Sequence, residues 1–181
     1  MKYLIASDIH GSAKYAAMVK EALERECADK LILLGDLLYH GPRNDLPEEY
    51  APKKVIEILN SLSDKIIAVR GNCDAEVDQM VLCFPIMADY AIVSCDDHSI
   101  FATHGHKITA DDRQNIGSCD IFLYGHTHIP ECRLEDGLYR LNPGSASIPK
   151  EGSAHGYMTF DGERFVRHDL TDGSVIEEIA L

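Results

Sequence analysis

The chain has 181 residues, of which 17 are Lys or Arg and 30 are Asp or Glu, so its formal net charge is −13. This length suits one domain, expected over residues 1–181, and the hydrophobic fraction of 45% excludes a disordered or collagen-like chain. The acidic balance argues against binding of extended nucleic acid through Lys and Arg. The sequence has no apolar run of about 18 residues, so we expect no membrane-spanning helix.

The first apolar stretch ends at Ser7-Asp8, where a signal peptide would remain apolar. The six cysteines form no CxxC pair, which argues against a zinc ribbon or a thioredoxin motif. We therefore expect a cytoplasmic protein that does not bind membranes. We also expect five of the cysteines to be small buried side chains, namely Cys27, Cys83, Cys95, Cys119 and Cys132.

Residues 1–70 alternate between strand and helix patterns. The expected elements are strands at 2–8, 31–34 and 66–69, a helix at 13–27 that Ser12 can cap, and a helix that begins at Pro52. This alternation predicts an α/β fold with parallel strands and right-handed crossovers.

The second half of the chain reads mainly as strands. Short β-type runs are expected at 91–94, 99–103, 121–124, 138–141, 156–160, 165–169 and 175–179. The turns Asp136-Gly137, Asp161-Gly162 and Asp172-Gly173 are typical of hairpins, so the last strands should be antiparallel.

Polar clusters follow five of the expected strands. They are Asp8-Ile9-His10, Gly35-Asp36, Gly71-Asn72, Thr103-His104-Gly105-His106 and Gly125-His126-Thr127-His128. Open α/β sheets bind ligands at the carboxyl ends of their strands, so we expect the five clusters to converge. Strand alternation should let Asp8 and His10 reach one ion, and the glycines should let backbone pass close to an ion or phosphate.

The donors in these clusters indicate metal chemistry. Two Asp, one Asn and four or five His are too many for one open zinc site, but they suit two metals that share a carboxylate. Two such metals can clamp the attacking and leaving oxygens of a displacement at phosphorus. The alternatives are structural: Asp8 and Asp36 as helix caps, and Asn72, His126 and His128 as turn residues.

In their order along the chain, the motifs resemble those of the calcineurin-like metallophosphoesterases. With Arg70-Gly71-Asn72-Cys73-Asp74 and Asn142-Pro143-Gly144-Ser145, they are similar to the small bacterial YfcE-type phosphodiesterases. The resemblance implies a four-layer α-β-β-α sandwich with two mixed sheets. It also implies that Asp8, His10 and His128 hold one metal, that Asn72, His104 and His126 hold a second, and that Asp36 bridges them, with a hydroxide between the ions as nucleophile.

The sequence departs from this family at one position. Many members have a His after the third-motif Asn, whereas this chain has Cys73, a weak acid for the leaving group. The candidate catalytic residues are therefore Cys73 and His106, the latter being equally well explained as a solvated loop residue. Arg70 is a candidate substrate-binding residue unless it pairs with a neighbouring Asp. His40, in the polar loop 38–51, is a second candidate.

The expected function is hydrolysis of small phosphodiesters with two divalent metal ions. Mn²⁺ is the preferred cofactor, and the donors also suit Fe, Zn, Ni or Co. The alternatives are a phosphomonoesterase, a dinucleoside-polyphosphate hydrolase, and a non-catalytic scaffold of the same fold. The presence of all seven implied ligands argues against the scaffold. The sequence leaves the oligomeric state open, and a homo-oligomer is possible.

Overall fold

The computed structural model describes residues 1–95 and 97–181. Its first sheet has the strand order β11-β10-β9-β1-β2-β3. Three parallel strands, β1 (Tyr3–Ala6), β2 (Lys30–Leu33) and β3 (Ile66–Ala68), lie beside three antiparallel ones, β9 (Gly156–Phe160), β10 (Arg164–Asp169) and β11 (Val175–Ala180). The sheet is mixed because β1 pairs with β2 on one side and with β9 on the other.

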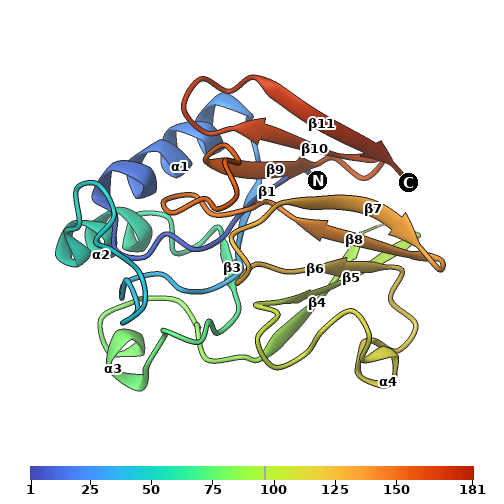
Figure 1. Cartoon of the computed structure of the whole chain (residues 1–181), viewed down its shortest axis with the longest axis horizontal. Coiled ribbons are helices and arrows are strands. Elements are labelled where there is room, and N and C mark those ends of the chain that lie inside the picture. Colours follow the sequence, from blue (N-terminus) through green and yellow to red (C-terminus); the bar gives the residue numbers. More distant parts are fainter. Residues whose placement is uncertain (96) are drawn as a thin grey trace.

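Two helices cover the outer face of the first sheet. Helix α1 (Ala13–Arg25) is capped by Ser12, whose hydroxyl accepts from the backbone N–H of Tyr15, and α2 (Pro52–Asn60) begins with its proline. Their apolar stripes pack on β1 and β2 through a cluster that includes Val19, Leu23 and Val55. These helices therefore form the first of four layers (Figure 1).

The second sheet has the order β4-β5-β6-β8-β7. Its strands are β4 (Tyr90–Cys95), β5 (His98–Thr103), β6 (Ile121–Leu123), β7 (Glu131–Glu135) and β8 (Leu138–Asn142). The parallel pairs β5–β6 and β6–β8 lie between antiparallel pairs at both edges. Two short helices, α3 (Glu76–Gln79) and α4 (Arg113–Ile116), complete the described elements.

The main core lies between the two sheets. Alternate residues of β1 point to opposite faces, so Ile5 packs with Ile100 and Ile121 of the second sheet while Leu4 faces the helices. On the outer face of the second sheet, Phe122 packs with Ile116 of α4. The order of layers is therefore helices, sheet, sheet, and a short helix with its loops.

The predicted fold class, with two mixed sheets, is confirmed. The expected strands and the two long helices occur within a few residues of their predicted bounds, but β7, α3 and α4 were not predicted. The expectation of five buried cysteines is wrong for Cys27 and Cys83, which are exposed after α1 and α3, and Cys132 is only partly buried. Within the described residues, no helix has the length and apolar character needed to cross a membrane.

Candidate metal centre

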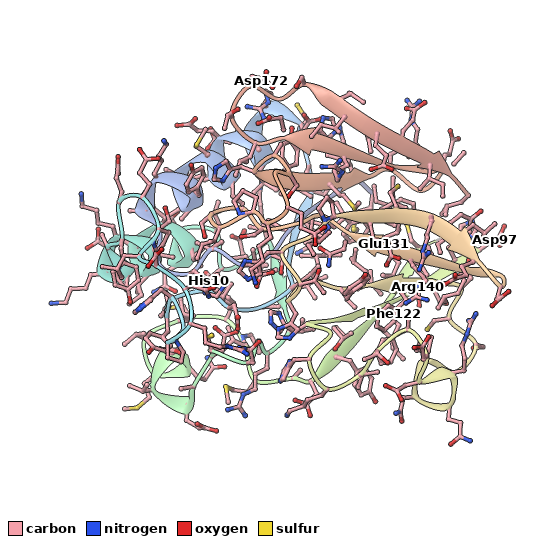
Figure 2. The ribbon with its side chains drawn as sticks, in the orientation of Figure 1. His10, Asp97, Phe122, Glu131, Arg140 and Asp172 are labelled. Carbon is pink, nitrogen blue, oxygen red and sulfur yellow. The ribbon has the colours of Figure 1, made fainter. Side chains whose placement is uncertain are left out.

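The five polar clusters meet at one end of the two sheets. Asp8 follows β1, Asp36 follows β2 and Asn72 follows β3, while His104 and His126 follow β5 and β6 of the second sheet. His10 marks this end in Figure 2, and Asp97, in the turn between β4 and β5, marks the opposite end. The structure thus brings together residues that lie up to 120 positions apart, from Asp8 to His128.

A first group of donors consists of Asp8, His10 and His128, all buried. The Nε2 atoms of His10 and His128 lie 3.2 Å apart, and Asp8 Oδ1 lies 3.5 Å and 3.2 Å from them. Asp8 Oδ1 is buried and has no hydrogen-bond partner among the described residues. Burial alone would raise the pKa of Asp8, but the imidazoles of His10 and His128 hold it well below its usual range.

The tautomers of these histidines favour a cation between them. The Nδ1 atoms of His10 and His128 lie 2.8 Å and 2.7 Å from the carbonyl oxygens of Tyr39 and Ile148. A carbonyl only accepts, so each Nδ1 carries the proton and donates it. In the neutral rings, both Nε2 lone pairs then face each other beside a carboxylate oxygen, an arrangement that a divalent metal ion would fit.

A second group of donors consists of Asp8, Asp36 and His104. His104 also donates from Nδ1 to a carbonyl, that of Leu34 at 2.6 Å, and its Nε2 lies 3.1 Å from Asn72 Oδ1 and 3.5 Å from Asp36 Oδ2. Asp36 Oδ2 is in turn 3.7 Å from His10 Nε2, so this oxygen faces both groups. Burial raises the pKa of Asp36, but His104 more than offsets this and lowers it.

His126 is placed less tightly than the other candidate ligands. Its ring centroid lies 5.1 Å from that of His104, and its backbone N–H donates to Asp8 Oδ2 at 3.0 Å. The side chain lines the same cavity as Asn72 and His10.

Left-handed backbone places most of these side chains. Among the described residues, nine non-glycine residues have positive φ, and five of them are candidate ligands: Asp8 at 57°, His10 at 49°, Asp36 at 57°, His126 at 67° and His128 at 61°. Such residues cost about 1–3 kcal/mol each and concentrate at functional sites. Strand alternation therefore does not aim Asp8 and His10, contrary to the expectation from the sequence.

Two glycines let the strand ends approach the carboxylates. A Cβ at Gly71 would lie 2.1 Å from Asp36 Oδ1, and one at Gly125 would lie 2.0 Å from Ser7 Oγ and 2.9 Å from Asp8 Oδ2. Any larger residue would displace the carboxylates. The glycines thus make room for Asp36 and Asp8 rather than directly for an ion.

Asp74 is a buried residue that the sequence analysis did not single out. Its carboxylate accepts from three backbone N–H groups, those of Asp36 at 2.9 Å, Leu37 at 2.9 Å and Gly71 at 2.7 Å. It therefore ties the turn after β2 to the turn after β3. Its place in the Gly71–Asp74 motif, three residues after a glycine, is the one local signal for this role.

The loop after β8 supports the first group of donors. Ser145 and Ser147 both donate from Oγ to the carbonyl of Asp8 at 2.9 Å, and Asn142 donates to the carbonyl of Gly125 at 2.9 Å. The motif Asn142–Ser145 is thus a loop near the candidate ligands. It helps to hold Asp8 in its left-handed conformation.

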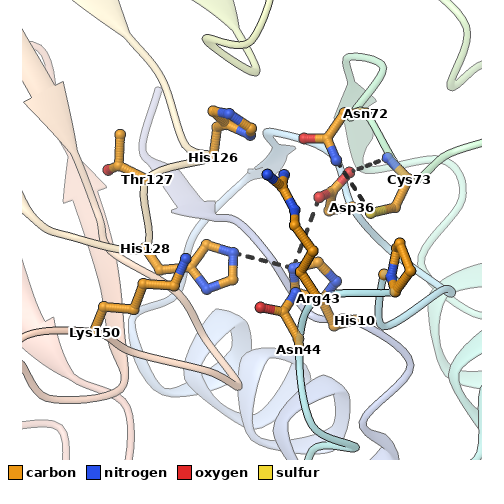
Figure 3. A pocket seen from close by; sticks show the side chains of 12 residues that line it. His10, Asp36, Arg43, Asn44, Asn72, Cys73, His126, Thr127, His128 and Lys150 are labelled. Carbon is orange, nitrogen blue, oxygen red and sulfur yellow. Dashed lines mark hydrogen bonds and ion pairs between the residues drawn. The ribbon is translucent and has the colours of Figure 1, made fainter.

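A cavity of about 430 Å³ opens onto both groups (Figure 3). It is lined by His10, Asp36, Gly41, Pro42, Arg43, Asn44, Asn72, Cys73, His126, Thr127, His128 and Lys150. This volume exceeds what one phosphate group needs and is in the range of small-molecule sites. The lining residues Arg43, Asn44 and Lys150 were not predicted; for the first two, the only signal was the polar loop 38–51.

Cys73 lines the cavity beside Asp36. Its backbone N–H donates to Asp36 Oδ1 at 2.7 Å, and Asn72 donates to its sulfur at 3.2 Å. Burial and the charge of Asp36 raise the pKa of the Cys73 thiol to about 12, so the thiol is neutral at physiological pH.

His106 lies behind the second group of donors. Its ring centroid is 5.3 Å from that of His104 and 6.0 Å from that of His126, and its buried Nδ1 has no hydrogen-bond partner within the described part of the chain. Burial and the neighbouring imidazoles lower the pKa of His106 to about 4. In this arrangement its ring is neutral at physiological pH and therefore a poor proton donor.

Arg70 and His40 do not line the cavity. The Arg70 side chain donates to the carbonyl of Asp74 at 3.2 Å and pairs with Glu76 at 3.3 Å, which corresponds to the alternative of a nearby acidic partner. The ring of His40 lies edge-on to Tyr39 and Tyr50, so it packs the loop internally. The expected substrate contacts of both side chains are therefore not supported, although Gly41–Asn44, directly after His40, reach the cavity.

Comparisons with known proteins found a matching family model and similar relatives over most of the chain. Residues 1–164 match the family model of the calcineurin-like phosphoesterase superfamily domain. The chain is 45% identical over 181 residues to phosphodiesterase YfcE of Escherichia coli K12. The alignment covers 100% of this chain and 98% of that protein. The structure of the E. coli phosphoesterase Yfce superposes with a TM-score of 0.94 at 44% identity, covering 99% of each chain.

More distant structures share the fold. A structure of a Vps29 variant from Entamoeba histolytica superposes with a TM-score of 0.68 at 22% identity, over 100% of this chain and 99% of that one. At this identity the likeness concerns the architecture alone.

Proposed function

The chain belongs to the calcineurin-like phosphoesterase superfamily and is a phosphoric ester hydrolase, and on that premise we propose that it hydrolyses small phosphodiesters with two divalent metal ions. The observation that carries this proposal is that the two donor groups share Asp8, and that Asp36 Oδ2 lies 3.5 Å from His104 Nε2 and 3.7 Å from His10 Nε2. A shared carboxylate is the usual way to hold two ions side by side.

The two ions are assigned to the ligands as follows. Asp8, His10 and His128 would hold the first ion, Asn72, His104 and His126 would hold the second, and Asp36 would be the carboxylate shared by the two. The proposal is supported by the Nδ1–H donations that fix the rings of His10, His104 and His128, since outer hydrogen bonds of this kind orient metal-binding histidines. When bound, the ions would polarise the phosphoryl oxygens and lower the pKa of a water molecule held between them.

The residues of the chain then have three tasks. The histidines would hold the ions, and the strained turns keep the donor side chains in place before substrate arrives. The cavity restricts the substrate to a small ester, because its volume is about 430 Å³. The protein's net charge of −13 disfavours long polyanions such as nucleic acid.

Manganese is the proposed metal, because carboxylate oxygens join the imidazoles in both groups and the amide oxygen of Asn72 lies beside the second; Fe, Zn, Ni and Co are compatible with the same donors. A cytoplasmic location is proposed as well. It is supported by the absence of a disulfide between described residues at Cys27, Cys73, Cys83, Cys119 and Cys132, as in a reducing compartment.

The proposal is tested with chelated protein and a chromogenic diester, bis(4-nitrophenyl) phosphate, beside 4-nitrophenyl phosphate. We expect diester turnover that needs added Mn²⁺ and exceeds monoester turnover, and that falls at least about a thousandfold in Asp36→Asn. Preference for the monoester would instead favour a phosphatase. Absence of turnover with Mn²⁺, Fe²⁺, Zn²⁺, Ni²⁺ or Co²⁺ would favour a scaffold of this fold.

A further inference from the structure

Arg43 is a cation without a partner in the cavity. Seven of the eight arginines in the sequence make a hydrogen bond or an ion pair, but Arg43 makes neither with any described residue. The chain has 30 acidic residues, so an unpaired arginine is unusual here. Asp36 lines the same cavity, but its carboxylate is occupied by the backbone of Cys73 and by His10 and His104.

The loop that carries Arg43 is shaped by local hydrogen bonds and packs on the turn after β3. Asn44 donates from Nδ2 to the carbonyl of His40 at 2.8 Å, and its backbone N–H donates to Gly41 at 3.4 Å. A Cβ at Gly41 would lie 3.1 Å from the sulfur of Cys73, so this turn packs directly on the turn after β3. The small side chains at positions 41 and 73 thus let the loop bring Arg43 to the cavity.

Lys150 enters the cavity from a different loop, between β8 and β9 (Figure 3). Its backbone N–H donates to the carbonyl of His128 at 3.2 Å, and its own carbonyl accepts from Ser153 at 3.0 Å. Its ammonium group likewise has no partner in the part of the chain that the structure describes. In Figure 3, Lys150 lies beside His128, and Arg43 lies on the side of Asp36 and Asn72.

These two cations exceed what a simple phosphodiester requires. Asp8 and Asp36 offset half of the charge of two divalent ions, so the metal centre alone attracts the single negative charge of a diester. Arg43 and Lys150 are therefore available for a second anion, and the planar guanidinium suits the paired oxygens of a carboxylate or phosphate.

Resting on the function proposed above, we propose that Arg43 and Lys150 form a second anion subsite, and that the preferred substrates are phosphodiesters carrying a further carboxylate or phosphate group on one alcohol arm. Both residues would determine which alcohol arm is preferred, whereas the metal centre would hold the scissile phosphate.

The test uses Mn²⁺-loaded protein and three 4-nitrophenyl phosphodiesters that differ only in the second arm: propyl, 2-carboxyethyl and 2-phosphoethyl. For wild type we expect kcat/KM on the two anionic arms to exceed that on the propyl arm by about tenfold, the effect of one charge-assisted hydrogen bond. In Arg43→Gln and in Lys150→Gln this ratio of kcat/KM values should fall by about threefold, through KM. Turnover of the propyl diester should stay within about twofold of wild type.

Lys54→Gln is the matched control, because Lys54 is an exposed lysine on α2, outside the cavity, and its loss changes the net charge equally. A second readout avoids turnover: calorimetry with the propyl and 2-carboxyethyl monoesters of methylphosphonate, which lack a good leaving group. The carboxyethyl ester should bind about tenfold tighter to wild type, and the two esters should bind alike to the Arg43→Gln, Lys150→Gln double variant.

Equal kcat/KM for the three arms in wild type would overturn the subsite while leaving the proposed function in place, since the propyl diester still reports it. An equal loss of kcat on all three diesters in Arg43→Gln would also overturn it, by placing Arg43 on the reacting phosphoryl group. If no diester is hydrolysed, both the proposed function and the subsite are wrong.

Discussion

At the scale of single residues, the two nitrogens of each buried histidine have different tasks. In His10, His104 and His128, Nδ1 donates to a backbone carbonyl, and Nε2 faces the carboxylates. A metal ion and a proton therefore compete for the same Nε2 atoms. This competition leads to a pH dependence that can be measured.

His104 should release a proton when metal binds. Burial lowers its pKa, but the hydrogen bond to Asp36 and the charges of Asp8 and Asp36 raise it to about 9. Below this pH the metal must displace the proton, so the apparent affinity for Mn²⁺ should rise about tenfold per pH unit from about pH 7 to 9. Calorimetry in buffers of different ionisation enthalpy measures the protons released. A Mn²⁺ affinity that does not change over this pH range would contradict the assignment. So would a pH dependence of the affinity in His104→Gln that is as steep as in wild type.

Asp74 should matter for stability and for metal binding without touching a metal. In Asp74→Asn, one amide oxygen replaces two carboxylate oxygens, and the amide N–H₂ faces a backbone donor, so at least one of three buried N–H groups loses its partner. We expect the free energy of unfolding of the metal-free protein to fall by about 2 kcal/mol, measured with urea. In the control Asp78→Asn, the amide oxygen can still accept the single bond from the backbone N–H of Ala75, so the change should cost less than about 1 kcal/mol. Equal costs in the two variants would show that Asp74 does not tie the turns together.

At the scale of elements, the site depends on how closely the turns after the strands approach one another. Gly71 lies against Asp36, whereas Gly137, in the hairpin between β7 and β8, has open space around its Cβ position. Substituting alanine at Gly71 therefore tests the effect of crowding, and substituting alanine at Gly137 tests the effect of backbone strain.

Gly71→Ala should therefore displace Asp36. We expect the affinity for Mn²⁺ to fall at least about tenfold and the free energy of unfolding to fall by about 2–3 kcal/mol. Gly137→Ala, with φ at 74°, should cost about 1 kcal/mol and leave the metal affinity unchanged. Metal affinity within twofold of wild type in Gly71→Ala would show that the close approach is not needed.

The elements that were predicted are those whose pattern is local. The apolar spacing of α1 and α2 and the runs of β1 to β3 can be read along the chain, and so can the hairpin turns of the last strands. Strand β7 was missed because it is an edge strand whose residues 131–135 alternate weakly and stay partly exposed. Helices α3 and α4 have four residues each, too few for a periodicity.

The candidate ligands could be predicted because they follow strands in short motifs. The way in which they are aimed could not, because it depends on left-handed backbone at Asp8, Asp36 and His128 and on hydrogen bonds from distant segments. Ser145 and Ser147 support Asp8 from more than 130 positions away. The lining role of Lys150 had no local signal, since it depends on how the loop after β8 returns to His128.

At the scale of the whole molecule, the two sheets bring the halves of the site together. The core between them joins β1 and β2 to β5 and β6, so the strand ends that carry Asp8 and Asp36 lie beside those that carry His104 and His126. The pairing of β1 with β9, some 155 positions along the chain, is non-local, and the sequence pattern alone did not predict it. The metal centre is thus a property of the complete sandwich rather than of either half.

Whether turnover needs two metal ions is measured by titrating chelated protein with Mn²⁺ while bound ions and diester turnover are followed in the same samples. We expect two ions per chain, with turnover that appears as the second ion binds, and no second ion in Asp36→Asn. Full turnover with one ion bound, or two ions bound without turnover of any phosphodiester, would contradict this expectation.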